Sequence, residues 1–99
     1  MMYNSYTRDM RCKFDLRKSR VVHGKHGISL EQAQEVFDQV YVVDQKSDDP
    51  EQYRVIGWCQ GGLWSVIFEI RQDRQGEYYY LVTAWKATTQ EEGYYAENC

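Results

Sequence analysis

The chain has 99 residues, a net charge of −3 and an ordinary hydrophobic content of 42%. This length predicts one domain with a modest core. No apolar run is long enough to predict a membrane span, and the first residues lack the basic flank and apolar block of a secretory signal. Three widely spaced cysteines, Cys12, Cys59 and Cys99, argue against a disulfide framework or a zinc site and favour a reducing cytoplasm.

The charge is unevenly distributed along the chain. Residues 1–26 hold seven basic and two acidic side chains, a net of +5, so residues 27–99 sum to −8. The split predicts one basic face on an acidic body. Such a face can bind phosphates. The alternative is a short helix that its lysines and arginines merely keep solvated.

The N-terminal region predicts an extension, a strand and a helix. Residues 1–10 are polar and are expected to form a flexible extension, which leaves 11–99 as the single domain. A short strand is predicted over 11–14. Asp15 is then a plausible N-cap for a first helix over 16–22.

A second helix is predicted after a glycine-marked turn. Gly24 and Gly27 indicate the turn, Ser29 is the expected N-cap, and Gln32 completes a capping box. The apolar side chains that follow recur at helical spacing and predict one buried face. They are Leu30, Ala33, Val36, Phe37 and Val40.

The hydrophobic period then changes to that of strands. Four strands are predicted, over 40–43, 53–59, 63–70 and 77–86. Residues 44–51 contain the only proline and predict a polar loop, whereas 60–62 predict a tight hairpin turn. Thr89 and Glu92 repeat the capping-box spacing and predict a short C-terminal helix.

Short turns between successive strands imply an antiparallel meander, and helices are the only elements available to cover it. The predicted fold class is therefore α+β. It consists of two N-terminal helices packed on a curled antiparallel four-stranded meander, followed by a short C-terminal helix.

A series of short motifs spans about residues 11–95. The first block reads Phe14-Asp15-Leu16-Arg17-Lys18, Lys25-His26-Gly27-Ile28 and Val36-Phe37-Asp38. Later blocks read Glu51-Gln52-Tyr53-Arg54-Val55-Ile56-Gly57, Gly62-Leu63-Trp64-Ser65-Val66-Ile67 and Tyr80-Leu81-Val82-Thr83-Ala84-Trp85-Lys86-Ala87-Thr88. In order and spacing these blocks resemble the BrnT family, the toxin half of a bacterial toxin–antitoxin pair.

The resemblance implies a RelE-like fold and a metal-independent mRNA ribonuclease that needs no cofactor. It also implies a cognate antitoxin with a ribbon-helix-helix DNA-binding domain, so that contact with DNA would be indirect, through the antitoxin. A cytoplasmic protein without membrane contact is expected.

In such a nuclease the ribose 2′-hydroxyl attacks the adjacent phosphate. A base must take its proton, and cations must stabilise the phosphoryl oxygens. The candidate catalytic residues are Lys25, His26, Arg54, Arg71 and Lys86. The candidate RNA-binding residues are Arg17, Lys18, Arg20, Tyr80 and Trp85.

Each candidate also has a structural interpretation. His26 could bind the backbone and orient the second helix, strand cations commonly solubilise a sheet, and about half of the aromatic strand residues must enter the core. His23 and His26 form a His-x-x-His pair, but no cysteine or carboxylate lies at ligand spacing, so no metal site is predicted.

Three arginine positions of the family pattern hold Gln52, Tyr80 and Trp85 here. Phosphoryl transfer depends on well-placed cations. An alternative function is therefore a non-catalytic, toxin-like binding module that retains partner recognition only.

Overall fold

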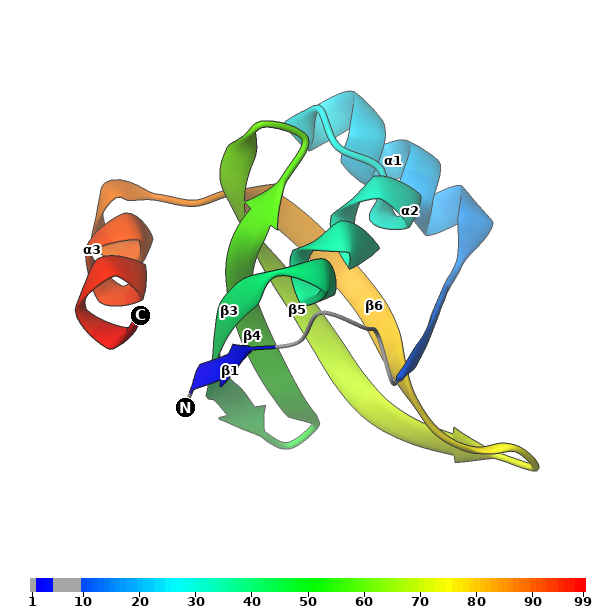
Figure 1. The fold of residues 1–99 in the computed structure, drawn as a ribbon. Coiled ribbons are helices and arrows are strands. Elements are labelled where there is room, and N and C mark those ends of the chain that lie inside the picture. Colours follow the sequence, from blue (N-terminus) through cyan, green and yellow to red (C-terminus); the bar gives the residue numbers. More distant parts are fainter. Residues whose placement is uncertain (1, 5–9) are drawn as a thin grey trace.

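The computed structural model describes residues 2–4 and 10–99 of the protein (Figure 1). Its elements are β1 (Met2–Asn4), β2 (Arg11–Phe14), α1 (Leu16–His26), α2 (Leu30–Ala33), the 3₁₀ helix η1 (Gln34–Asp38), β3 (Val40–Asp48), β4 (Glu51–Cys59), β5 (Gly62–Asp73), β6 (Gly76–Lys86) and α3 (Thr89–Asn98). Of the predicted N-terminal extension, residues 1 and 5–9 lie outside the described residues, while 2–4 form β1. In the described part of the chain, no helix has the length and apolar character needed to cross a membrane.

The strands form one mixed sheet in the order β1-β3-β4-β5-β6-β2. Strands β3 to β6 are successive antiparallel neighbours. Strand β2 instead runs parallel to β6, with Arg11 opposite Tyr78 and Phe14 opposite Leu81. The predicted sheet, an antiparallel meander of four strands, was therefore wrong. The meander is the centre of a larger sheet, because the start of the domain returns to pair with its last strand.

The prediction of two N-terminal helices on this sheet was also wrong. The capping box at Ser29 is present, with Ser29 Oγ accepting from Gln32 N at 3.0 Å and Gln32 Oε1 accepting from Ser29 N at 3.1 Å. However, α2 lasts about one turn before the chain tightens into η1. That tighter turn directs both Val36 and Phe37 into the core immediately before β3 begins.

Helix α1 is longer than predicted and runs through Gly24. Asp15 caps its start as predicted, its Oδ1 accepting from Arg17 N at 2.8 Å and Lys18 N at 3.1 Å. The helix ends at Gly27, whose φ of +84° lies in the left-handed region that glycine adopts without a steric cost.

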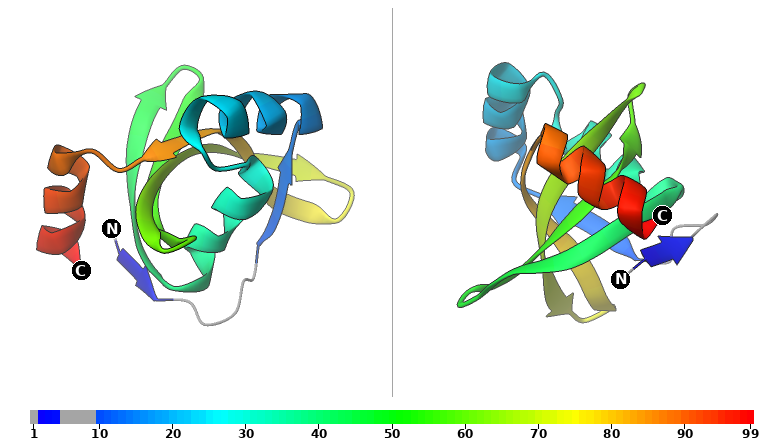
Figure 2. Two further views of the ribbon diagram at one scale, coloured as in Figure 1. Left: turned by 90° about the horizontal axis from the view of Figure 1, so that it is seen from above. Right: turned by 90° about the vertical axis from the view of Figure 1, so that its left-hand side faces the viewer.

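Both faces of the sheet carry packed helices. Figure 2 shows α2 and η1 inside the curl of the sheet and α3 outside it. Neighbouring residues of β4 therefore both become buried: Val55 belongs to the core under α2 and η1, and Ile56 packs with Leu63 and the tyrosines of α3. The large core thus depends on the curl, and a smaller second core depends on α3.

Two local predictions shift in the structure. The loop expected at 44–51 is mostly strand, since β3 continues to Asp48 and Asp44 lies opposite Arg54. The cap of α3 is Thr88 with Glu91, one residue earlier than the predicted pair Thr89 and Glu92. Both pairs have the capping spacing, and the choice between them follows from the burial of Glu91, which is only 6% exposed.

Candidate functional site

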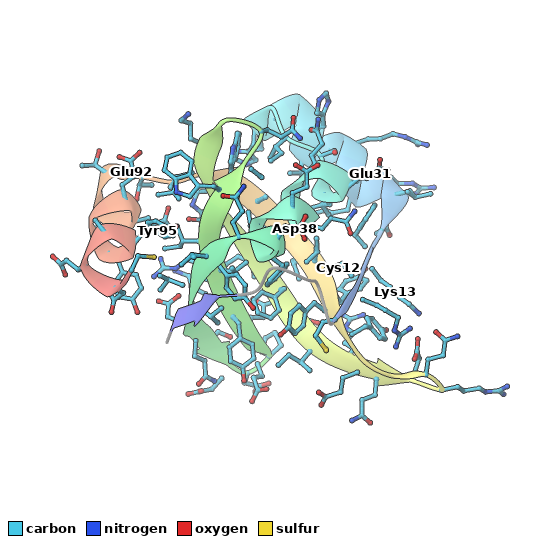
Figure 3. The ribbon with its side chains drawn as sticks, in the orientation of Figure 1. Cys12, Lys13, Glu31, Asp38, Glu92 and Tyr95 are labelled. Atoms are coloured by element: carbon cyan, nitrogen blue, oxygen red, sulfur yellow. The ribbon has the colours of Figure 1, made fainter. Side chains whose placement is uncertain are left out.

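The five candidate catalytic residues do not converge on one site. Lys25 and His26 lie in the last turn of α1, whereas Arg54, Arg71 and Lys86 lie on three successive strands of the sheet. Lys86 lies opposite Trp64 and Arg71 lies opposite Tyr78, at opposite ends of the β5–β6 pairing. Figure 3 shows Glu31 beside α1 at one side and Glu92 of α3 at the other.

Arg54 is held between two carboxylates. Its Nη2 lies 2.5 Å from Asp44 Oδ2, and its Nη1 lies 3.1 Å from Glu91 Oε2. The Arg54 side chain is only 18% exposed. The Asp44 hydrogen bond is the main reason that the pKa of Arg54 is raised above its usual value. Two carboxylates therefore more than neutralise this guanidinium, so it presents no free positive charge to a phosphate.

Glu91 joins Arg54 to another candidate, Trp85. The indole Nε1 of Trp85 donates to Glu91 Oε1 at 3.0 Å, and the backbone N–H of Thr88 donates to the same oxygen at 3.0 Å. Burial alone would raise the pKa of Glu91. The donors from Thr88 and Trp85, together with the charge of Arg54, lower that pKa below its ordinary value. Glu91 is therefore an ionised, buried anchor that fixes α3 on the sheet.

Arg71 has a similar local arrangement. Its Nη2 lies 2.7 Å from Glu69 Oε1, and its guanidinium carbon lies 3.8 Å from the centre of the Tyr80 ring. Gln52 Nε2 donates to the other Glu69 oxygen at 2.7 Å. The hydrogen bond from Gln52 and then that from Arg71 lower the pKa of Glu69. Arg71 is thus paired with a carboxylate and stacked on an aromatic ring.

The three positions that depart from the BrnT pattern all contact these pairs. Gln52 binds Glu69, Tyr80 lies under Arg71, and Trp85 binds Glu91. The side chains at these three positions therefore belong to two polar networks on the sheet. Sequence reasoning missed the acidic members Asp44, Glu69 and Glu91, although the N3 position of a capping box is a signal that could have identified Glu91.

Helix α1 carries four cations that remain available on one element. Its sequence contains no acidic residue, and the side chains of the four cations that we call the α1 basic face are exposed. Within the described residues none of these side chains forms an ion pair. By contrast, Arg11 and Lys13 on β2 both bind Asp73, at 2.8 Å and 2.7 Å. The α1 basic face consists of Arg17, Lys18, Arg20 and Lys25.

Lys86 belongs neither to the paired strand arginines nor to the α1 basic face. Its Nζ lies 5.9 Å from the centre of the Trp64 ring, at the end of β6. Among residues 2–4 and 10–99 it forms no ion pair. A single cation next to an aromatic ring supplies neither a general base nor a second charge for a phosphoryl group.

Several residues of the BrnT-like motif have structural roles. Asp15 caps α1, Gly27 ends it, and Ile28 is fully buried. Phe37 packs against Tyr41, Phe68 and Tyr79 in the core. The motif thus describes how the helical region is built, and its exposed members Lys18 and Lys25 belong to the α1 basic face.

The cysteines form no disulfide in the structure. Cys59 is buried, and burial together with the charge of Glu35 raises the pKa of its thiol to about 12. Such a thiol is an inert part of the core. In the described ranges, no three histidine, cysteine or acidic side chains are placed to hold a metal ion.

Comparisons with known proteins leave the family assignment as a prediction. No protein-family model matches this chain, and no curated protein is significantly similar to it in sequence. The functional argument therefore depends on the charges and contacts described above.

Proposed function

We propose that this protein is the toxin-like member of a bacterial toxin–antitoxin pair and that it binds RNA through the α1 basic face. Its proposed partner is an antitoxin with a ribbon-helix-helix domain, and its proposed location is the cytoplasm. The BrnT-like motif order supports the pairing, and the free thiols agree with a reducing compartment.

One observation carries the RNA-binding part of the proposal. Four cations on one short helix are exposed and have no ion pair in the described residues, on a chain whose net charge is −3. Unpaired lysine and arginine side chains displace the counterions of a nucleic acid, and this displacement supplies most of non-specific affinity. An acidic body would repel RNA everywhere except at such a face.

The same geometry favours binding over cleavage. Cleavage needs a proton acceptor and cations arranged around one phosphate. Arg54 and Arg71 are instead paired with carboxylates, and neither lies on the element that holds Lys25 and His26. A non-catalytic binding module is therefore the form of the proposal that these contacts support.

A ribonuclease is the second candidate, and one observation favours it. Lys25 and His26 occupy adjacent positions in the last turn of α1, next to the remaining cations of the helix. An imidazole can exchange a proton with a ribose hydroxyl, while a neighbouring lysine can bind the phosphate.

RNA binding can be tested with a pair of charge-matched variants. The double variant Arg17→Ala/Lys18→Ala removes two charges from α1, and Lys46→Ala/Arg74→Ala removes two exposed charges elsewhere. For single-stranded RNA we expect the α1 variant to bind about tenfold more weakly, with a salt dependence reduced by about 1.4 in the log–log slope. The control should stay within about twofold of the parent protein. Equal weakening in both variants would refute a specific role for α1.

Cleavage is tested in cells. The chain is induced alone, as the parent and as Lys25→Ala/His26→Ala, and growth and bulk mRNA are followed. Intact mRNA and normal growth from folded protein would support the binding module. Rapid mRNA loss and growth arrest, both relieved in the variant, would establish the ribonuclease instead. Co-expression of a neighbouring ribbon-helix-helix gene, followed by co-purification, tests the proposed partner.

A further inference from the structure

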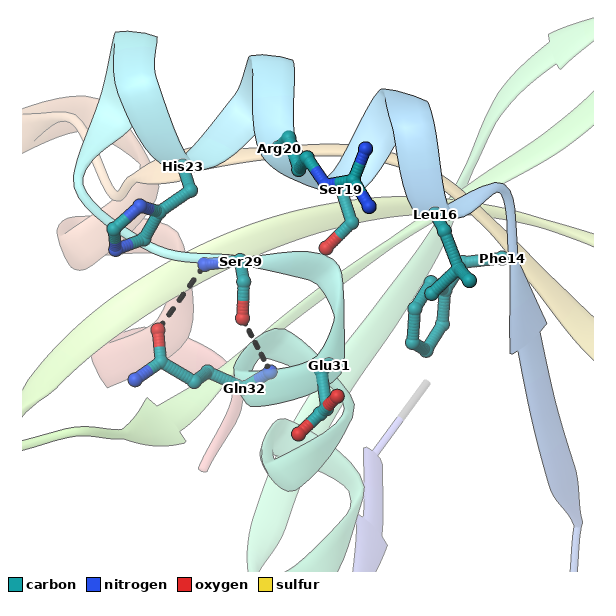
Figure 4. Close-up of a pocket in the computed structure, with 8 residues that line it drawn as sticks. All are labelled: Phe14, Leu16, Ser19, Arg20, His23, Ser29, Glu31 and Gln32. Carbon is teal, nitrogen blue, oxygen red and sulfur yellow. Dashed lines mark hydrogen bonds between the residues drawn. The ribbon is translucent and has the colours of Figure 1, made fainter.

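A pocket with a volume of about 440 Å³ opens between α1 and α2, beside the α1 basic face (Figure 4). Phe14 and Leu16 line one end and His23 the other, with Arg20 between them on α1 and Glu31 on the α2 side. A pocket of this size accommodates a mononucleotide unit.

The walls of this pocket are held at a fixed spacing. Ser19 Oγ, on α1, accepts from the backbone N–H of Leu30 at 2.9 Å, which ties the two helices together. On the α2 side, Ser29 and Gln32 are occupied by their reciprocal capping bonds. The polar groups that join α1 to α2 therefore hydrogen-bond to each other, and the pocket is already formed in the absence of a ligand.

The charged groups of the pocket are free, in contrast to those on the sheet. In the part of the chain that the structure describes, no ion pair or side-chain hydrogen bond involves Arg20, His23 or Glu31. All three side chains are exposed. A cation and a carboxylate that line one cavity without binding each other suit a ligand that carries both an anion and N–H donors.

We propose that this pocket binds a guanosine of single-stranded RNA. The Watson–Crick edge of guanine presents two donor groups, N1–H and the N2 amino group, to the two oxygens of Glu31. The flat base would contact Phe14 and Leu16, and the adjoining phosphate would bind Arg20 and His23. Adenine and cytosine each present one amino donor beside an acceptor nitrogen, and uracil presents one N–H between two acceptors. A carboxylate therefore favours guanine.

This inference rests on the proposed RNA binding by α1 and adds its base preference. The test uses the full chain and three fluorescent heptanucleotides, each with a central G, A or inosine flanked by uridines. Inosine is guanosine without the N2 amino group. We expect the G oligonucleotide to bind about tenfold more tightly than the A oligonucleotide, with inosine between them.

The variant Glu31→Gln should lose the preference for G. Its overall RNA affinity is expected to rise, because a negative charge beside the basic face has been removed, so the ratio between oligonucleotides is the measurement. Glu97→Gln removes the same charge from an exposed site on α3 and should keep the preference.

The outcomes separate this inference from the proposed function. Equal binding of all three oligonucleotides, still weakened by Arg17→Ala/Lys18→Ala, would overturn the guanosine site and leave RNA binding by α1 in place. Absence of binding to any oligonucleotide would overturn both. Competition by guanosine monophosphate at oligonucleotide concentrations would identify a free nucleotide as the ligand and would overturn the assignment to RNA.

Discussion

Replacing Arg54 with alanine should destabilise the fold and leave RNA binding intact. The change removes the guanidinium that binds Asp44 at 2.5 Å and Glu91 at 3.1 Å. The Glu91 side chain is 8% exposed, so water cannot fully replace the lost cation. A carboxylate would then remain ionised and buried without its opposite charge.

The size of the expected loss in stability depends on the hydrogen bonds that Glu91 keeps when Arg54 is removed. Removing one partner of a buried ion pair costs about 3–5 kcal/mol. Glu91 retains the donors from Thr88 N and Trp85 Nε1, both at 3.0 Å, and Arg54 itself is not fully buried. We therefore expect the free energy of unfolding to fall by about 2–3 kcal/mol. For a domain of this length the melting temperature should fall by about 10–20 °C.

Urea unfolding followed by tryptophan fluorescence measures this change. The double variant Arg54→Ala/Glu91→Gln removes the stranded charge and should recover part of the loss, because a neutral amide is less costly to bury. Arg74→Ala removes an exposed arginine of the β5–β6 turn and should change stability by less than about 0.5 kcal/mol.

An Arg54→Ala protein as stable as the parent, with RNA affinity reduced about tenfold or more, would refute the reasoning. Arg54 would then be a phosphate contact, as the sequence-based candidate set has it, and its carboxylate partners would be incidental. A destabilised variant with unchanged RNA affinity below its melting temperature is the expected result.

Two further predictions concern packing and pH. Gly57→Ala should lower the free energy of unfolding by about 2 kcal/mol, since the new Cβ would lie 2.9 Å from the backbone oxygen of Val36 on η1. Gly24 lies inside α1 with open space around it, so Gly24→Ala should raise the free energy of unfolding by about 0.5–1 kcal/mol in the same urea assay. If both variants lose stability equally, close packing of η1 on β4 is not the cause.

The pKa of Glu91 is lowered in the folded protein, so its ionised form stabilises the fold. This contribution is fully present above the unfolded-state pKa of about 4.3 and is lost as the pH falls through the lower folded-state pKa. The stability difference between the parent and Glu91→Gln should therefore be constant from about pH 7 to pH 5 and shrink below about pH 4, and a difference independent of pH down to pH 2 would contradict this account.

Local features of the fold were predictable because they depend on residues close together in the chain. Asp15 caps α1 through the next two N–H groups that it can reach, and Ser29 and Gln32 close their capping box over three positions. The hairpin turn after β4 forms where predicted, at Gln60 and Gly61, whose φ values are both positive. Each of these features depends on short-range geometry, which the types of neighbouring residues indicate directly.

The site was less predictable, because charge depends on neighbours that are distant in sequence. Arg17 and Arg54 are both arginines, and the sequence alone gives no sign that they differ in exposure or in pairing. Only the structure shows that Arg54 meets Asp44, 10 positions away, and Glu91, 37 positions away, whereas Arg17 has no ion-pair partner among the described residues. A list of cations therefore could not separate those that stabilise the fold from those that are free to bind.

The sequence by itself determined the helix caps, the hairpin turn, the apolar faces and the basic N-terminal region, since each is a property of composition or of neighbours along the chain. The tertiary structure alone decided that β2 pairs in parallel with β6, that Thr88 and not Thr89 caps α3, and that Arg54 is neutralised by Asp44 and Glu91. The physical reason is the same in all three cases. Each outcome depends on burial or on pairing between segments distant in sequence, which only the folded sheet brings together.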